Sequence, residues 1–124
     1  MKRLNYIVYT FEHFKRQVLL YYIIIMGVRL FDQYTYLHFA VGIIVYFWSI
    51  SILNWFILHT IFEFLENTQM GMNIINKYIV FWPGGKPKSD SIINSVGDTF
   101  GAIIGWLSAY YLDKNGNKYD YLHT

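Results

Sequence analysis

Long apolar stretches alternate with short polar ones along this chain. Residues 1–17 differ from the rest, because their apolar positions recur at helical spacing between two basic pairs, a pattern typical of an amphipathic surface helix. The later apolar stretches approach the roughly 20 residues that a membrane-spanning helix needs. We expect four such stretches, at 18–31, 34–50, 52–67 and 89–112, with a loop at 68–88 and a polar tail at 113–124.

This pattern predicts the fold class: an all-α integral membrane protein with a helical bundle of about four short transmembrane helices plus the N-terminal amphipathic surface helix. Residues 1–124 would form a single membrane domain. The segment 34–67 is nearly unbroken apolar sequence and allows two interpretations. As one helix it would run roughly 50 Å, beyond a hydrocarbon core of about 30 Å. We favour a tight hairpin that turns between Ser49 and Asn54, because those residue types tolerate turns.

The stretch 89–113 carries polar residues that share one helical face with glycines. Residues four apart lie on one stripe of a helix, and glycine lets a second backbone approach closely. We therefore expect this helix to be central, with Gly101 and Gly105 against the helix that carries Glu63. The stripe consists of Asp90, Asn94 and Asp98, followed by Gly97, Gly101 and Gly105.

A hairpin topology brings many polar side chains to one end of the bundle. His59, Glu63 and Glu66 share a face by their spacing of four and seven residues. Buried carboxyl groups in such a place are costly unless they are partnered, so they mark a candidate site. We predict Glu63, Asp98, Asp90 and His38 as catalytic residues, with Glu66, Asn67, Asn94, Asp32 and Tyr34 in binding or supporting roles.

Three kinds of chemistry fit such a cluster. It could bind a divalent metal through carboxylates and either His38 or His59, with a position left for water, and Glu63, Asp98 and His59 are the candidate ligands. It could work without metal, one carboxyl group serving as acid and another as base. It could also be a hydrogen-bonded clamp with no catalytic role. The spacings match no established metal signature, so the three remain open.

Composition narrows the function classes. Hydrophobic residues make up 55% of the 124 residues and charged residues only 15%, against about 25% charged in a typical globular domain. There is no cysteine, which excludes disulfides and thiolate metal sites. The net charge is +2 without a basic patch interleaved with aromatics, so we expect no nucleic-acid partner. The expected partners are a lipid bilayer and a lipid-type substrate, and the weak bias of lysines and arginines favours both termini in the cytoplasm.

Three blocks of this sequence resemble a small family of bacterial inner-membrane proteins known only as a domain of unknown function. DQYTYLHFAVGIIVY, HTIFEFLENT and SDSIINSVGDT occur in the family's order, and from the first block to the last they span about half of the chain. The family pattern has a glutamate where this chain has His59, and often a second histidine where it has Val41. The layout is more distantly similar to VanZ-like membrane proteins. The resemblance implies a fold and a polar site, and no reaction.

Two functions follow as expectations. The first is a membrane-embedded hydrolase or transferase that acts on a lipid or lipid-linked substrate at one membrane face. The second is a non-catalytic structural or assembly protein of a cellular or viral membrane. A path for ions ranks last, because it would need polar residues through the whole bilayer.

Overall fold

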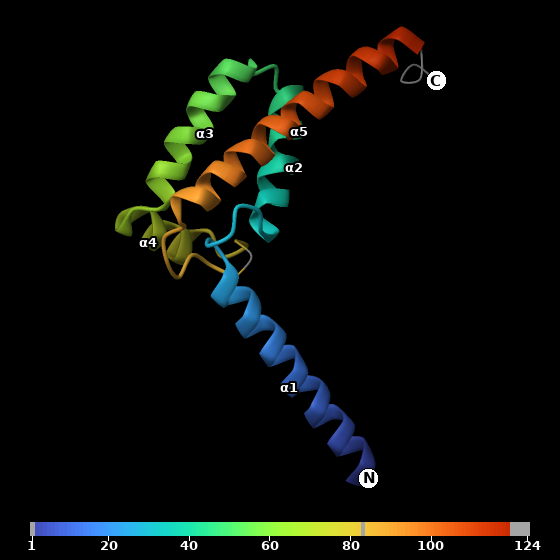
Figure 1. Cartoon of the computed structure of the whole chain (residues 1–124), viewed down its shortest axis with the longest axis vertical. Helices are drawn as coiled ribbons and strands as arrows, with labels where there is room; N and C mark the ends of the chain where they lie inside the picture. Colours follow the sequence, from blue (N-terminus) through green and yellow to red (C-terminus); the bar gives the residue numbers. More distant parts are fainter. Residues whose placement is uncertain (1, 83, 120–124) are drawn as a thin grey trace.

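A computed structural model describes residues 2–82 and 84–119, and these residues form five helices and no strand. They are α1 (Lys2–Ile25), α2 (Gln33–Phe47), α3 (Ile52–Glu66), α4 (Gln69–Tyr78) and α5 (Ile92–Tyr119). Helices α2, α3 and α5 pack into a small bundle, and α4 lies at the foot of α3 (Figure 1). Helix α1 projects away from the other four (Figure 1).

The expectation of a membrane bundle is wrong for this structure. Within residues 2–82 and 84–119, no helix is both long enough and apolar enough to cross a membrane. Helices α2 and α3 are apolar but have only 15 residues each. Helices α1 and α5 are long enough, at 24 and 28 residues, but charged side chains interrupt both. The predicted transmembrane helices, and the integral membrane location with both termini in the cytoplasm, are therefore not supported.

Several predicted boundaries also shift. Residues 2–17 of the predicted surface helix and residues 18–25 of the predicted span form one continuous helix, α1, which ends at Ile25 and leaves residues 26–31 as turns. The predicted loop at 68–88 contains α4. Helix α5 begins three residues later than expected, at Ile92, where the Ser91 hydroxyl accepts a hydrogen bond from the Asn94 N–H at 3.2 Å. It then continues to Tyr119 through most of the predicted polar tail, and residues 120–124 of that tail lie outside the described residues.

A sharp turn divides the long apolar segment into α2 and α3, so the structure follows the hairpin and not the single helix. Ser49 adopts a positive φ of 60°, which ends α2. Ser51 then caps α3, its hydroxyl accepting from the Asn54 N–H at 3.3 Å. The indole N–H of Trp106 in α5 donates to the Ile50 carbonyl at 2.8 Å and fixes the turn against the bundle.

Glycines of α5 let its backbone touch α2. A Cβ placed at Gly105 would collide with the backbone carbonyl of Phe39, and one placed at Gly101 would press against Thr35. From the other side, a Cβ at Gly42 would collide with the backbone of Ala102. The glycine stripe therefore faces α2, whereas the sequence suggested the helix that carries Glu63. That helix, α3, packs against a neighbouring face of α5.

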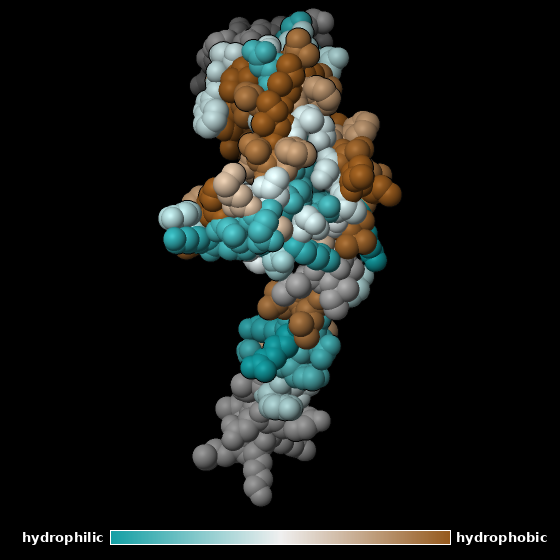
Figure 2. Space-filling model, turned by 90° about the vertical axis from the view of Figure 1, so that its left-hand side faces the viewer, coloured by the Kyte–Doolittle hydropathy of each residue, from teal (hydrophilic) through white to brown (hydrophobic). Residues whose placement is uncertain are grey.

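The apolar core lies at the turn end of the bundle. Val45, Trp55 and Ala102 are buried there, and the Trp55 indole N–H donates to the Ala102 carbonyl at 3.1 Å. The surface of the bundle is also largely apolar. Figure 2 shows hydrophobic side chains over its upper part and hydrophilic ones at the level of α4. Since the core occupies one end, the polar residues are left to fill the other.

The contact between α2 and α5 predicts the effect of one added methyl group. Gly105→Ala should lower the free energy of unfolding by about 1–3 kcal/mol, because the methyl group meets the Phe39 backbone. At an exposed helical position the same change would stabilise by up to about 1 kcal/mol. Urea unfolding measures the change in the free energy of unfolding and shows whether the added methyl group destabilises or stabilises the protein. The control is Val96→Ile on the half-exposed face of α5, which should change stability by less than about 0.5 kcal/mol. A Gly105→Ala protein as stable as the parent would contradict the packing.

Candidate functional site

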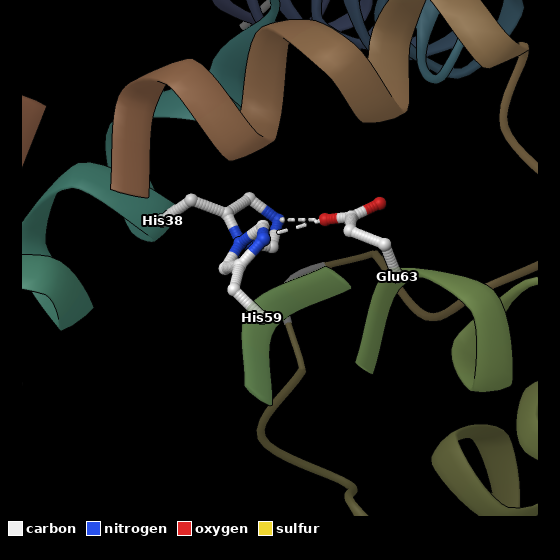
Figure 3. A group of neighbouring side chains, drawn as sticks. All are labelled: His38, His59 and Glu63. Carbon is white, nitrogen blue, oxygen red and sulfur yellow. Dashed lines mark hydrogen bonds and ion pairs between the residues drawn. The ribbon is translucent and has the colours of Figure 1, made fainter. Parts of the chain in front are cut away.

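Two histidines and a glutamate converge between α2 and α3 (Figure 3). His59 and Glu63 are one turn apart on α3, and His38 reaches them from α2. His59 Nε2 lies 2.9 Å from His38 Nδ1. Glu63 Oε1 lies 3.5 Å from His38 Nε2 and 3.6 Å from His59 Nε2. All three side chains are buried, with His59 only 1% exposed.

Asp98 of α5 closes the group from the opposite side. Its Oδ2 lies 3.7 Å from His38 Nε2, and its Oδ1 accepts a hydrogen bond from the Thr35 hydroxyl at 2.5 Å. Behind His59, the Thr99 hydroxyl lies 3.3 Å from Nδ1 while it donates to the Ser95 carbonyl at 2.8 Å. Each ionisable side chain is therefore oriented by a neighbour on α2 or α5.

Lys86 forms a second, adjoining centre. Its ammonium group pairs with Glu66 at 3.0 Å and makes a short contact with Asp90. Asn76 of α4 holds the lysine backbone through two hydrogen bonds, at 2.6 Å to its N–H and 2.8 Å to its carbonyl. Lys86 is only 6% exposed. The loop after α4 thus inserts a buried cation beneath the bundle.

The predicted asparagines and the residues before α2 build the frame of the site. Asn67 donates to the Glu63 carbonyl at 2.8 Å and accepts from the Asp90 N–H at 2.6 Å. Asn94 donates to the Arg29 carbonyl at 2.8 Å. Asp32 caps α2 through a capping box. Tyr34 stacks on Trp82, with ring centroids 6.3 Å apart.

Of the residues predicted as catalytic, the structure brings His38, Glu63, Asp98 and Asp90 together, with Glu66 and His59 beside them. Asn67 touches the cluster, whereas Asn94 and Asp32 bond to backbone groups outside it. Tyr34 lines a small cavity on its border.

Burial sets the pKa values in this cluster. It raises the pKa of Glu63 to about 8, helped by the charges of Glu66 and Asp98 and only partly offset by the Ser95 hydroxyl and by Lys86. Burial likewise raises the pKa of Asp98 to about 7, against the Thr35 hydrogen bond, and that of Glu66 to about 7, against the Lys86 charge.

The pKa values of the two imidazoles and that of the lysine shift in opposite directions. Burial lowers the pKa of His38 to about 4 and that of His59 to about 3, so both imidazoles are neutral near pH 7. For Lys86 burial lowers the pKa, but Asp90 and Glu66 outweigh it and leave the pKa above its ordinary value. The neutral imidazoles are therefore available as proton acceptors or metal ligands.

The cluster lies between a groove and a cavity. An open, mainly apolar groove runs between α3 and α5 and reaches Glu63, Asn67 and Ser95 at one end. Phe56 and Phe100 continue it toward the turn end of α3. On the other side, a small cavity is lined by Met26, Tyr34, His38, Glu66, Trp82, Lys86, Asp90 and Asp98.

Two overlapping sets of side chains could hold a cation. His38, His59 and Glu63 place ligand atoms within 4.8 Å of one another, and so do Glu63, Asp90 and Asp98. The sequence suggested Glu63, Asp98 and His59 as metal ligands. In the structure Glu63 shares one set with His59 and His38 and the other set with Asp98 and Asp90.

The sequence offered Lys86 only as one of three basic side chains, with Arg29 and Lys88, that could neutralise the cluster; it did not predict that Lys86 is buried, and it missed the orienting hydroxyl groups of Thr35 and Thr99. Lys86 follows Pro83, Gly84 and Gly85, and a lone lysine in such a segment looks like a solvated charge. Its position four residues before Asp90 was the available signal. The threonines carry no signal of their own in an apolar helix, because only packing decides which carboxylate or imidazole they meet.

Comparisons of the chain with protein-family models, with curated proteins and with solved structures find no match. The resemblance to the inner-membrane family and to VanZ-like proteins therefore stays a prediction, and the site has to be interpreted from its own geometry.

The buried ion pairs of Lys86 predict a large effect of its removal. Lys86→Met keeps an unbranched side chain as far as Cε but removes the ammonium group and leaves Glu66 and Asp90 without their shared cation, which should cost about 3–5 kcal/mol of stability. The matched control is Lys77→Met on α4, where the lysine is exposed over Tyr78 and its loss should cost less than about 1 kcal/mol. Chemical unfolding measures both variants, and equal effects would contradict the buried pair.

The shifted pKa values predict that the protein without bound metal becomes less stable from pH 6.5 to about pH 8. The folded state keeps protons on Glu63, Glu66 and Asp98 that the unfolded chain has already released, so the stability from these groups is lost as pH rises through the folded pKa values. The histidines affect stability only below pH 6.5, where the unfolded chain binds protons that the folded state does not, and they lower the stability as the pH falls.

Urea midpoints measured across this pH range in chelator-containing buffer test the prediction. Glu63→Gln removes one of the three carboxyl groups and should flatten the slope, whereas Glu12→Gln on the exposed surface of α1 should leave it unchanged. A midpoint that rises with pH would show that the carboxyl groups are ionised at no cost in the folded state.

Proposed function

We propose that this chain is a hydrolase that cleaves the ester bond of a neutral amphiphile with a single acyl chain. One observation carries the proposal: Glu63 belongs both to the buried ionisable cluster and to the lining of the apolar groove between α3 and α5. A molecule that lies in the groove therefore has its end beside the reactive groups.

The groove favours a long, apolar ligand. Its walls are aliphatic and aromatic side chains, among them Phe56, Phe64, Val96 and Phe100. From Ile52 to Glu63 it follows about 16 Å of α3, at about 1.5 Å per residue. Carboxyl and amide side chains lie at one end, where Glu63 and Asn67 line the groove, and elsewhere the only polar lining residues that the structure describes are threonines and a serine. This division matches a molecule with an acyl chain and one polar end.

Charge selects the polar end. Glu63, Glu66, Asp90 and Asp98 supply four carboxyl groups, and Lys86 pairs with two of them. An anionic headgroup would meet a site that already carries an excess of acidic groups. A neutral ester avoids this repulsion, whereas a phosphate ester does not. The proposed substrate is therefore a carboxylic ester.

The chemistry needs a proton acceptor beside the scissile bond. Water attacks the carbonyl carbon, the bond between the acyl carbon and the alkoxy oxygen breaks, and an acid and an alcohol are formed. The proton that water loses passes to a group of the cluster and returns to the departing alkoxide. His38, His59, Glu63 and Asp98 are the candidates for this transfer, because their side chains lie within about one water molecule of one another.

The test compares p-nitrophenyl laurate with p-nitrophenyl acetate. Thr60→Trp places a large ring in the groove one turn before Glu63, and should lower the ratio of kcat/KM for laurate to that for acetate at least about tenfold. The control is Ile61→Trp, at a half-exposed position of α3 beside the groove residues, which should leave the ratio unchanged. Glu63→Gln should lower hydrolysis of both esters by about 10²–10⁴-fold, and Glu12→Gln should not.

Two results would contradict the proposal. If the folded parent protein hydrolyses neither ester, the cluster has no esterase role, and the alternative of a non-catalytic structural protein gains. If p-nitrophenyl phosphate is the better substrate, the charge argument is wrong. Circular dichroism of each variant separates a loss of activity from a loss of fold.

A further inference from the structure

We propose that His38, His59 and Glu63 bind one divalent transition-metal ion of the zinc type. This inference rests on its own geometry and also deepens the proposed hydrolase, since it adds a metal to the same cluster. The three ligands come from two helices and are separated by as many as 25 positions of the chain, so that only the fold brings them together.

The distances suit coordination. In a tetrahedral zinc site, bonds of about 2.0–2.1 Å place neighbouring ligand atoms about 3.3 Å apart. Glu63 Oε1 lies 3.5 Å from His38 Nε2 and 3.6 Å from His59 Nε2. The side chains therefore already point at a common centre (Figure 3). Coordination through both Nε2 atoms would replace the 2.9 Å contact between His59 Nε2 and His38 Nδ1.

Glu63 provides an independent observation. Its side chain is 5% exposed, and neither of its carboxylate oxygens makes a hydrogen bond of good geometry among the described residues, although the Ser95 hydroxyl lies near enough to favour the charged carboxylate. A buried polar group without a partner costs about 1–3 kcal/mol, and more when it is charged. A cation between Glu63 and the imidazoles supplies the missing partner. The other buried carboxylate with a comparable position, Asp98, already accepts from Thr35.

The surroundings of the ligands also fit a metal. Thr99 lies against His59 Nδ1, which leaves Nε2 to face Glu63. Such a hydrogen-bonding neighbour on the second ring nitrogen is the usual support of a metal-bound histidine. Two nitrogens and one oxygen, in a chain without cysteine, favour zinc or cobalt over magnesium or calcium, which prefer oxygen ligands.

Three protein ligands leave a fourth position for water. Asp98 is the adjacent carboxylate, with Oδ2 3.7 Å from His38 Nε2, and it is placed to accept a proton from that water. Under the proposed function this divides the cluster: His38, His59 and Glu63 are ligands, and Asp98 is the proton acceptor.

Titration of the chelator-treated protein with Zn²⁺ tests the site. We expect one ion per chain, and a visible Co²⁺ spectrum with the intensity typical of four-coordinate sites. His38→Ala and His59→Ala should each weaken Zn²⁺ binding at least about 100-fold, and Glu63→Gln at least about tenfold. The matched control is His13→Ala on the exposed part of α1, which should bind like the parent.

Measurements on the parent protein do not depend on whether the variants fold. X-ray absorption at the zinc edge should show nitrogen and oxygen ligands, with the outer-shell scattering of two imidazoles. Absence of Zn²⁺ and Co²⁺ binding by the folded parent would overturn the proposal, and so would binding that is lost in His13→Ala but kept in His59→Ala. Metal binding without ester hydrolysis would retain the metal site and reject the hydrolase. Ester hydrolysis by a parent protein that binds neither Zn²⁺ nor Co²⁺ would retain the hydrolase and reject the metal site.

Discussion

The backbone contact between α2 and α5 is the constraint on which the rest of the structure depends. It exists because Gly101 and Gly105 of α5, and Gly42 of α2, present no side chain where the helices cross. The close crossing sets His38 of α2 against Asp98 of α5. Helix α3 then packs on a neighbouring face of α5 and adds His59 and Glu63. A small protein without a large apolar core thus obtains a buried and ordered polar site.

Charge balance divides this polar site into two halves. In one half Lys86 neutralises Glu66 and Asp90, and Asn76 holds the lysine in place. In the other half Glu63 and Asp98 face two imidazoles whose pKa values burial lowers to about 4 and about 3. That half must bind protons or a cation to be stable, because buried carboxylates near each other raise one another's pKa. A structural half next to a half that can exchange protons or metal is an arrangement suited to chemistry.

The sequence predicted the inward face of the last helix and the main members of the cluster, because polar and glycine positions four residues apart can share only one stripe. It also indicated the turn near Ser49. It could not predict that the glycines face α2, since α2 and α3 are both mainly apolar and both carry polar residues that meet in the cluster. It could not choose Lys86 over Arg29 and Lys88 as the cation of the cluster, because the burial of Lys86 depends on the path of a loop. The membrane bundle was wrong because apolar composition was taken for spanning length, whereas Ser49 and the charges of α1 and α5 interrupt the apolar runs.

The central claim is that His38, His59 and Glu63 form one built site at the end of an apolar groove. Anomalous diffraction at the zinc edge, from crystals grown with Zn²⁺, tests it most directly. The account predicts an anomalous peak about 2.0–2.2 Å from both imidazole Nε2 atoms and from a Glu63 oxygen. A peak bound only by surface residues such as His13, or an electron-density map in which Glu63 turns away from the two histidines, would contradict it.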